Sequence, residues 1–185
     1  MPTWDDSQAI AQVVPDGVMP TAIGGIPVQR WAEPPRTAAA WEQLAQPRIT
    51  EPDWLPPKGC KAAAGVVTVD TDGRVWVVAP SNGYAGYRAT FPKGTVDPGM
   101  SLQATALREA FEESGLHVRL ARHLVDVRRS QSYTRYYLAE RVGGDPAQMG
   151  WESQAVMLVP PARLAQVVHH PNDQPILAAL AAPAP

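Results

Sequence analysis

Apolar, β-branched residues gather into short runs that predict strands from residue 62 onwards. Ala62–Val69 and Arg74–Ala79 are two such runs, and the turn residues Asp70-Thr71-Asp72-Gly73 lie between them. Two strand-like runs joined by a short turn rich in Asp and Gly predict a β-hairpin. Further strand candidates follow the hairpin at Tyr87–Phe91, His117–Arg128, Ser132–Val142 and Trp151–Val159.

A helical period is visible between and after these strands. Ser101–Ser114 has apolar residues at helical spacing and stops at Gly115, a usual residue just past a helix end. Pro161–Val168 and Pro175–Leu180 predict two closing helices. Strands on both sides of one central helix indicate a mixed sheet between helices, which is a three-layer α/β domain.

The first third of the chain differs from the rest in its high proline content. Half of the 20 prolines precede residue 60, and proline excludes a long helix or a central strand there. Short helices are predicted at Asp5–Val14 and Thr37–Leu44, and four tryptophans offer large apolar surfaces for burial. We therefore interpret residues 1–58 as a proline-rich arm with short helices, and residues 59–185 as the main domain. The arm packs either on that domain or on a second subunit, as in a homodimer.

Composition and net charge indicate a folded protein and argue against a nucleic-acid partner. The 185 residues suffice for one domain with a core, and the 45% apolar and 18% charged content is that of a folded globular chain. The net charge of -2 does not indicate a general polyanion-binding surface, so no nucleic-acid partner is predicted. Any recognition of phosphate must therefore be local.

The single cysteine, Cys60, excludes an intramolecular disulfide and indicates a reducing compartment. The alternative for Cys60 is a reactive thiol, but no histidine is near it in the sequence. The first thirty residues show no signal peptide, and no apolar stretch approaches the roughly 18 residues of a membrane span. The sequence thus predicts a cytoplasmic protein without membrane association.

Three carboxylates lie on one face of the central helix. Glu109, Glu112 and Glu113 are three or four positions apart or adjacent, and the opposite face is apolar. Glu109 and Glu113 repel each other at i,i+4, and the end of a helix favours cations over anions. Arg108 cannot neutralise three acids. The cluster is either a solvated acidic face or a site for a divalent cation such as Mg²⁺ or Mn²⁺, which prefers oxygen ligands.

The loop before this helix, Phe91–Gly99, is punctuated by glycine and proline. Gly94 lets the backbone approach a ligand closely, and Lys93 offers a positive charge to a phosphate. An ordinary structural turn is the alternative interpretation of the same residues.

Together, the loop and the helix resemble the Nudix box, Gly-x5-Glu-x7-Arg-Glu-U-x-Glu-Glu-x-Gly-U, where U is aliphatic. Gly94 opens the pattern and Arg108 to Leu116 close it at the expected spacing. The resemblance extends through the flanking strands over roughly residues 60–170. It implies a Nudix-type three-layer α/β/α sandwich with a mixed sheet. Two positions depart from the pattern: Met100 replaces its first glutamate, and Ala110 is small for an aliphatic position.

The resemblance also implies roles for the box residues. Glu109, Glu112 and Glu113 would hold Mg²⁺, with one of them acting on the nucleophilic water, and the carbonyl of Lys93 could complete the metal shell. Such ions bridge phosphate oxygens and lower the pKa of bound water. In the family the first glutamate supports the loop and helix through the arginine, here Arg108, so Met100 puts the rigidity of the loop in question.

Two later stretches bear on the substrate. Tyr133 to Glu140 and Trp151 to Met157 resemble the corresponding strands of diadenosine tetraphosphate hydrolases, where a glutamate at the position of Glu152 joins the metal or base machinery. Tyr136 or Tyr137 could stack on a base, although neighbours on a strand face opposite ways. The basic residues that could contact phosphates are Arg128, Arg129 and Arg135. His169 and His170 lack metal-ligand spacing.

The predicted function is Mg²⁺-dependent hydrolysis of a phosphoanhydride in a nucleoside diphosphate-linked small molecule, foremost a diadenosine polyphosphate. The enzyme alternatives are diphosphoinositol polyphosphate, ADP-ribose or nucleoside triphosphate hydrolysis. The alternative outside enzymes is a nucleotide sensor with a decayed site, suggested by Met100.

Overall fold

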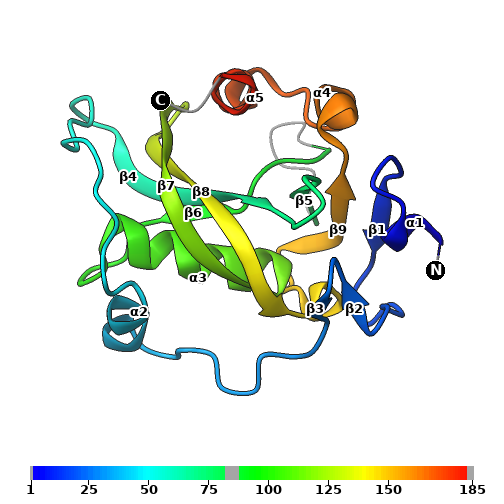
Figure 1. Ribbon diagram of the computed structural model, residues 1–185. Coiled ribbons are helices and arrows are strands. Elements are labelled where there is room, and N and C mark those ends of the chain that lie inside the picture. Colours follow the sequence, from blue (N-terminus) through cyan, green and yellow to red (C-terminus); the bar gives the residue numbers. More distant parts are fainter. Residues whose placement is uncertain (1, 82–87, 183–185) are drawn as a thin grey trace.

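The structure, a computed structural model, describes residues 2–81 and 88–182 and is built around one mixed sheet (Figure 1). The strands run in the order β1-β9-β5-β4-β8-β7, and β6 pairs with β4. Their bounds are β1 (Ala11–Val13), β4 (Lys61–Val69), β5 (Val75–Pro80), β6 (Lys93–Thr95), β7 (Leu116–Arg128), β8 (Ser132–Gly144) and β9 (Ser153–Val159). β4 and β8 are parallel, and the other pairs in this sheet are antiparallel. β2 (Ala22–Ile23) and β3 (Ile26–Pro27) form a separate hairpin.

Helices cover both faces of the sheet (Figure 1). They are α1 (Pro2–Asp5), α2 (Ala38–Leu44), α3 (Leu102–Ser114), α4 (Leu164–Val167) and α5 (Gln174–Ala181). α3 packs on one face, where Val66 and Trp76 join its apolar residues in one core cluster. Val67 belongs to the second cluster, on the other face, with Ile176 of α5. Because neighbouring residues of β4 serve opposite clusters, the sheet is buried on both sides and the predicted three-layer architecture is confirmed.

Most predicted elements lie where the pattern places them. The hairpin of β4 and β5, the central helix α3, strands β7 and β8 and the closing helices α4 and α5 are confirmed. The helix predicted at Thr37–Leu44 is α2, with Thr37 as its N-cap accepting a hydrogen bond from the Ala40 amide at 3.2 Å.

Three predicted elements differ from the structure. Residues 5–14 are not one helix, because only Pro2–Asp5 is helical and Ala11–Val13 pairs with β9, which buries Ala11 and Val13 in the sheet. The strand predicted at Tyr87–Phe91 begins outside the described residues, and its described part forms only a single bridge between Thr90 and Val78. Trp151 and Glu152 form a turn before β9 and do not belong to the strand itself.

The N-terminal segment packs on the domain of its own chain. Trp4 stacks on Trp76 with 6.1 Å between ring centroids, and Arg74 donates hydrogen bonds to the carbonyls of Thr3 and Trp4. Further along, Trp31 stacks on His117 with 3.8 Å between centroids. These contacts show the N-terminal segment packed against residues 74–117 of its own chain, and its association with a second subunit stays a prediction.

The pair of Asp70 and Arg141 is wholly buried and supports the first testable prediction. Arg141 Nε lies 2.6 Å from Asp70 Oδ2, which also accepts a hydrogen bond from Trp76 Nε1 at 2.8 Å. Asp70→Ala leaves the guanidinium buried without its anion, so we expect a loss of about 3–5 kcal/mol in the free energy of unfolding, measured by urea denaturation. The matched control is Glu140→Ala in the exposed pair with Arg119, which should change stability by about 0.5 kcal/mol. Equal effects of the two substitutions would contradict the prediction.

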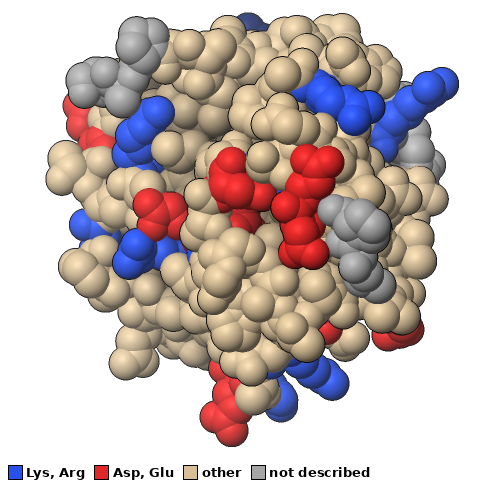
Figure 2. Space-filling model, turned by 45° about the vertical axis from the view of Figure 1, so that its right-hand side comes forward, with Lys and Arg blue, Asp and Glu red and all other residues tan. Residues whose placement is uncertain are grey.

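Acidic side chains gather near the centre of the face shown in Figure 2, and the basic side chains lie towards the edges of this view. Within the described part of the chain, no helix has the length and apolar character needed to cross a bilayer.

Candidate active site

Helix α3 is fixed at both ends, which sets the direction of its acidic face. Ser101 caps the start by accepting a hydrogen bond from the Ala104 amide at 3.2 Å, and the arm residue Glu42 accepts one from the Ser101 amide. Gly115 ends the helix with a φ of 69°, a left-handed conformation that glycine adopts without strain. The last two turns therefore present Glu109, Glu112 and Glu113 in defined positions.

Glu109 lies beneath the loop that contains Gly94. A Cβ atom on Gly94 would lie 2.3 Å from the Glu109 carboxylate carbon, so a larger residue would displace this carboxylate from its place. Glu109 is 7% exposed and accepts a hydrogen bond from Arg108 Nη2 at 2.8 Å. Burial raises the pKa of Glu109, and the Arg108 guanidinium opposes this shift. Glycine at position 94 thus leaves room for a buried carboxylate beneath the loop.

Glu113 is the most strongly perturbed acid of the helix. It is 8% exposed, and its Oε1 accepts a hydrogen bond from the Lys93 amide at 3.3 Å. Burial raises the pKa of Glu113 to about 7; the Lys93 charge opposes this shift, while Glu109 and Glu152 add to it. Glu113 therefore changes its protonation state near neutral pH.

Glu112 lies on the outer side of the cluster. Its carboxylate is 3.5 Å from Arg108 Nε. Partial burial raises the pKa of Glu112, Arg108 opposes the shift, and repulsion from Glu152 reinforces it. Glu109 and Glu112 thus share Arg108, whereas Glu113 contacts the Lys93 amide.

A cavity of about 460 Å³ opens beside Glu113 and receives Glu152. The turn that carries Glu152 is anchored twice: Gly150 N donates to the Glu112 carbonyl and Ser81 N donates to the Glu152 carbonyl, both at 2.8 Å. Glu152 raises the pKa of all three helix acids by repulsion. The fold therefore brings together the four carboxylates that the sequence predicted for one site.

The donor set suits a divalent cation, although its oxygens do not converge. Among residues 2–81 and 88–182, no three His, Cys, Asp or Glu side chains form a ready metal-binding cluster. Glu109 points to Arg108, and Glu113 points to the Lys93 amide. However, mutual repulsion among hard oxygen donors is the conflict that Mg²⁺ or Mn²⁺ would relieve. Cation binding would require these side chains to turn toward one another.

Three residues predicted to bind substrate are in the core, so this part of the prediction is wrong. Tyr136 and Tyr137 have no exposed surface, and Arg135 is 1% exposed. The Tyr136 hydroxyl accepts from Arg129, the Tyr137 hydroxyl donates to Glu51, and Arg135 forms an ion pair with Asp126 at 2.7 Å. The two tyrosines do face opposite sides of the sheet, as predicted, but both sides are covered by packed layers.

Of the other residues predicted to contact the substrate, some line the cavity and one does not. Lys93 lines the cavity, and its contact with phosphate stays a prediction. Arg128 is exposed at the end of β7 and does not line this cavity, whereas its neighbour Arg129 does. Arg129 also forms an ion pair with Asp173 at 2.5 Å.

Sequence reasoning missed several residues of the site. Those lining the cavity without a sequence signal include Lys61, Ser81, Ser132, Trp151 and Asn172. The parallel register of Lys61 with Ser132 brings two of them together, and such a pairing cannot be read from either segment alone. Asp97, which pairs with Arg108, was missed as well.

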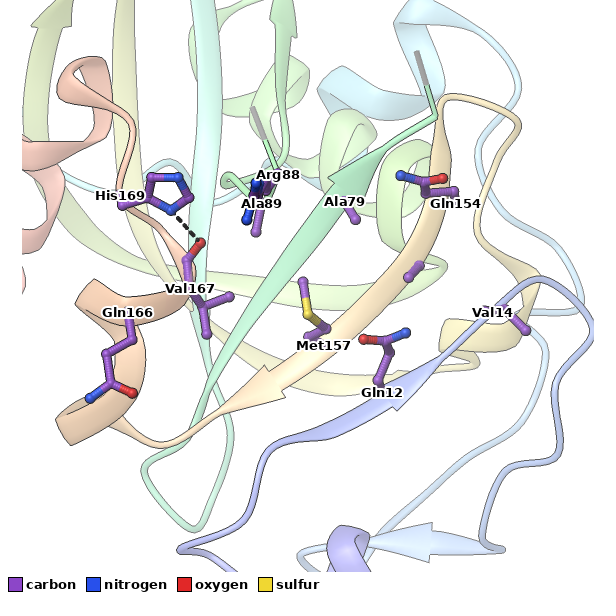
Figure 3. A pocket seen from close by; sticks show the side chains of 11 residues that line it. Gln12, Val14, Ala79, Arg88, Ala89, Gln154, Met157, Gln166, Val167 and His169 are labelled. Atoms are coloured by element: carbon purple, nitrogen blue, oxygen red, sulfur yellow. Dashed lines mark hydrogen bonds between the residues drawn. The ribbon is translucent and has the colours of Figure 1, made fainter. Parts of the chain in front are cut away.

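A second cavity, of about 420 Å³, is lined by residues of β1, β9 and β5 and is shown in Figure 3. Gln12, Gln154 and Gln166 surround an apolar floor that includes Met157, and His169 is bonded to the Val167 carbonyl. The described residues that line it include no carboxylate, so they do not suit a divalent cation.

Comparisons with known proteins agree with this geometry. A family model described as NUDIX domain matches residues 60–180. Among solved structures, an Ap4A hydrolase from C. elegans has a TM-score of 0.54 at 22% identity, covering 64% of this chain and 94% of its own. A NUDIX hydrolase from Nitrosomonas europaea has a TM-score of 0.54 at 19% identity, covering 65% of this chain and 70% of its own. An ADP-ribose pyrophosphatase from Streptococcus suis has a TM-score of 0.52 at 18% identity, covering 67% of this chain and 94% of its own. No curated protein matches the chain. At these identities the structural likeness establishes the fold.

Proposed function

The chain belongs to the NUDIX family of pyrophosphohydrolases, and on that premise we propose that it hydrolyses a phosphoanhydride bond in a nucleoside diphosphate-linked substrate. We propose a diadenosine polyphosphate as the preferred class. The observation that carries the proposal is the position of Glu152, which lines the same cavity as Glu113 and Lys93. The likeness to the C. elegans Ap4A hydrolase supports the same substrate class.

Glu109, Glu112 and Glu113 would hold Mg²⁺, or Mn²⁺ in its place, and the Lys93 carbonyl could add a further oxygen. When bound, the cation neutralises phosphate charge and lowers the pKa of water. Glu152 is exposed and lines the cavity, and its carboxylate would accept a proton from the attacking water. Lys61 and Lys93 line the same cavity, and their positive charges would attract the phosphates.

Diphosphoinositol polyphosphates are the less favoured substrate. A polyphosphorylated ring needs a dense basic pocket, whereas Lys61, Lys93 and Arg129 share this cavity with Glu113 and Glu152. ADP-ribose and nucleoside triphosphates keep the nucleoside and remain the enzyme alternatives, since the Streptococcus suis protein of the same fold is an ADP-ribose pyrophosphatase.

The division of the chain is part of the proposal. We propose that residues 1–58 are an arm and residues 59–185 the catalytic domain. The start of the family match at residue 60 and the pairing of β1 with β9 support an arm that completes the edge of the sheet.

A substrate panel tests the function. Purified protein is incubated with diadenosine tetraphosphate, ADP-ribose, nucleoside triphosphates and a diphosphoinositol polyphosphate, with and without Mg²⁺, and products are identified by mass spectrometry. We expect Mg²⁺-dependent cleavage of diadenosine tetraphosphate with the highest kcat/KM. Glu112→Gln should lower kcat by about two orders of magnitude, because several kcal/mol of charge stabilisation are lost, while circular dichroism shows an intact fold. Unchanged turnover in this variant would remove the metal role, and cleavage of ADP-ribose alone would overturn the substrate class.

A further inference from the structure

Trp151 is the tryptophan that the fold leaves in solvent. Its side chain is 83% exposed, whereas the other five tryptophans are buried or half-buried. Trp151 also lines the cavity that contains Glu113 and Glu152. A residue that lines a cavity while remaining so exposed lies at its rim. One face of the indole is therefore available to a molecule entering the site.

The backbone beneath Trp151 is held in place by the catalytic helix. Gly150 N donates to the Glu112 carbonyl at 2.8 Å, and a Cβ atom on Gly150 would lie 2.4 Å from that oxygen. Glycine at this position is what allows the turn to dock on α3. On the other side of Trp151, the Glu152 carbonyl accepts from Ser81 N at 2.8 Å. The indole thus projects from a turn tied on both sides, at a fixed place beside Glu152.

The cavity has charged residues inside and an aromatic residue at its rim, which matches a ligand with a phosphate group at one end and an aromatic ring at the other. Charged groups that suit phosphates and their counterions, Lys93 and Glu113, line the cavity itself. The rim offers a broad aromatic face, on which a nucleobase can stack irrespective of its hydrogen-bonding edge. An inositol ring has no π-face and would gain little from this contact.

We propose that Trp151 is the base-stacking platform of the site and that it selects substrates carrying a nucleobase. The inference rests on the proposed function, because it assigns the part of the substrate beyond the scissile anhydride. It replaces the stacking role predicted for Tyr136 and Tyr137, whose rings are buried.

The test compares AMP with ribose 5-phosphate, two probes that differ by the base alone. Isothermal titration with each in the presence of Mg²⁺ gives the ratio of their Kd values. We expect the wild-type protein to prefer AMP by about tenfold, Trp151→Ala to bring the ratio near one, and Trp151→Phe to retain most of it. Val18→Ala, which truncates a 77% exposed side chain in the arm, is the control and should leave the ratio unchanged.

The outcomes separate this inference from the proposed function. An AMP preference that survives in Trp151→Ala, or a wild-type protein that binds AMP no better than ribose 5-phosphate, would overturn the stacking role. A preference that depends on Trp151 in a protein that cleaves no member of the substrate panel would retain the stacking role and overturn the hydrolase function. Because the side chain is so exposed, its truncation removes no core packing and the variant should fold.

Discussion

Glutamine in place of Glu113 is expected to lower kcat by about two to three orders of magnitude while stabilising the metal-free protein above neutral pH. The activity falls because a neutral amide is a poor ligand for a divalent cation. The stability rises because the variant no longer buries a carboxylate that is 8% exposed. If Glu113 served only in packing, its replacement would not lower kcat while raising the free energy of unfolding.

The pH dependence follows from the direction of the shift. The folded pKa of Glu113 is about 7, above its ordinary value of 4.5, so between these pH values the folded state binds more protons than the unfolded state. The wild-type free energy of unfolding should therefore fall as pH rises through this window, by about 3 kcal/mol relative to Glu113→Gln. Urea denaturation at pH 5 and pH 8 in the presence of EDTA measures the difference. A variant that is less stable than the wild type at pH 8 would contradict the assignment.

Magnesium should make the wild-type protein more stable than Glu113→Gln, which reverses their order of stability without the metal. A cation that binds only the folded state stabilises it by mass action. At pH 8 the wild type should gain melting temperature with Mg²⁺, and Glu113→Gln should gain much less. Glu140→Gln, in an exposed pair far along the sequence from the helix, is the charge-matched control and should respond like the wild type.

Local patterns predicted the helix and its acids because the cause is local. Periodicity, the cap at Ser101 and Gly115 place α3 within one residue, and the i,i+4 repulsion of Glu109 and Glu113 is a property of that segment alone. The short strand Ala11–Val13 was misread as helix because pairing with β9 decides its conformation. Local propensity is weak where tertiary contacts fix the backbone.

The tyrosines show the same limit at the site. Alternation along β8 correctly separates Tyr136 from Tyr137, but it cannot tell that layers cover both faces of that strand. Trp151 was assigned to a strand and acquires its exposed position only because Gly150 docks on the helix. The acids of a motif can be predicted from spacing, whereas the groups that surround a substrate depend on which loops the fold brings together.

Met100 stands where the family pattern has a glutamate, and the structure shows Asp97 in contact with the arginine instead. Arg108 Nη1 donates a hydrogen bond to Asp97 Oδ2, and Nη2 bonds to Glu109 Oε1 at 2.8 Å and to the Thr95 carbonyl at 3.2 Å. Asp97 therefore orients the guanidinium that holds Glu109. We expect Asp97→Asn to lower kcat by about tenfold, because Asp97 positions the arginine that contacts Glu109, a proposed ligand of the metal.

Rescue at position 100 distinguishes this positioning role from a general loss of stability. Met100 Sδ already lies 3.3 Å from Arg108 Nη1, so a carboxylate introduced there can replace the one removed. The double variant Asp97→Asn with Met100→Glu should recover most of the wild-type kcat, and Met100→Glu alone should change it little. Steady-state kinetics on diadenosine tetraphosphate measures all four proteins. A large gain from Met100→Glu alone would mean that the natural site is impaired, and a failure to rescue would show that Asp97 acts on something other than Arg108.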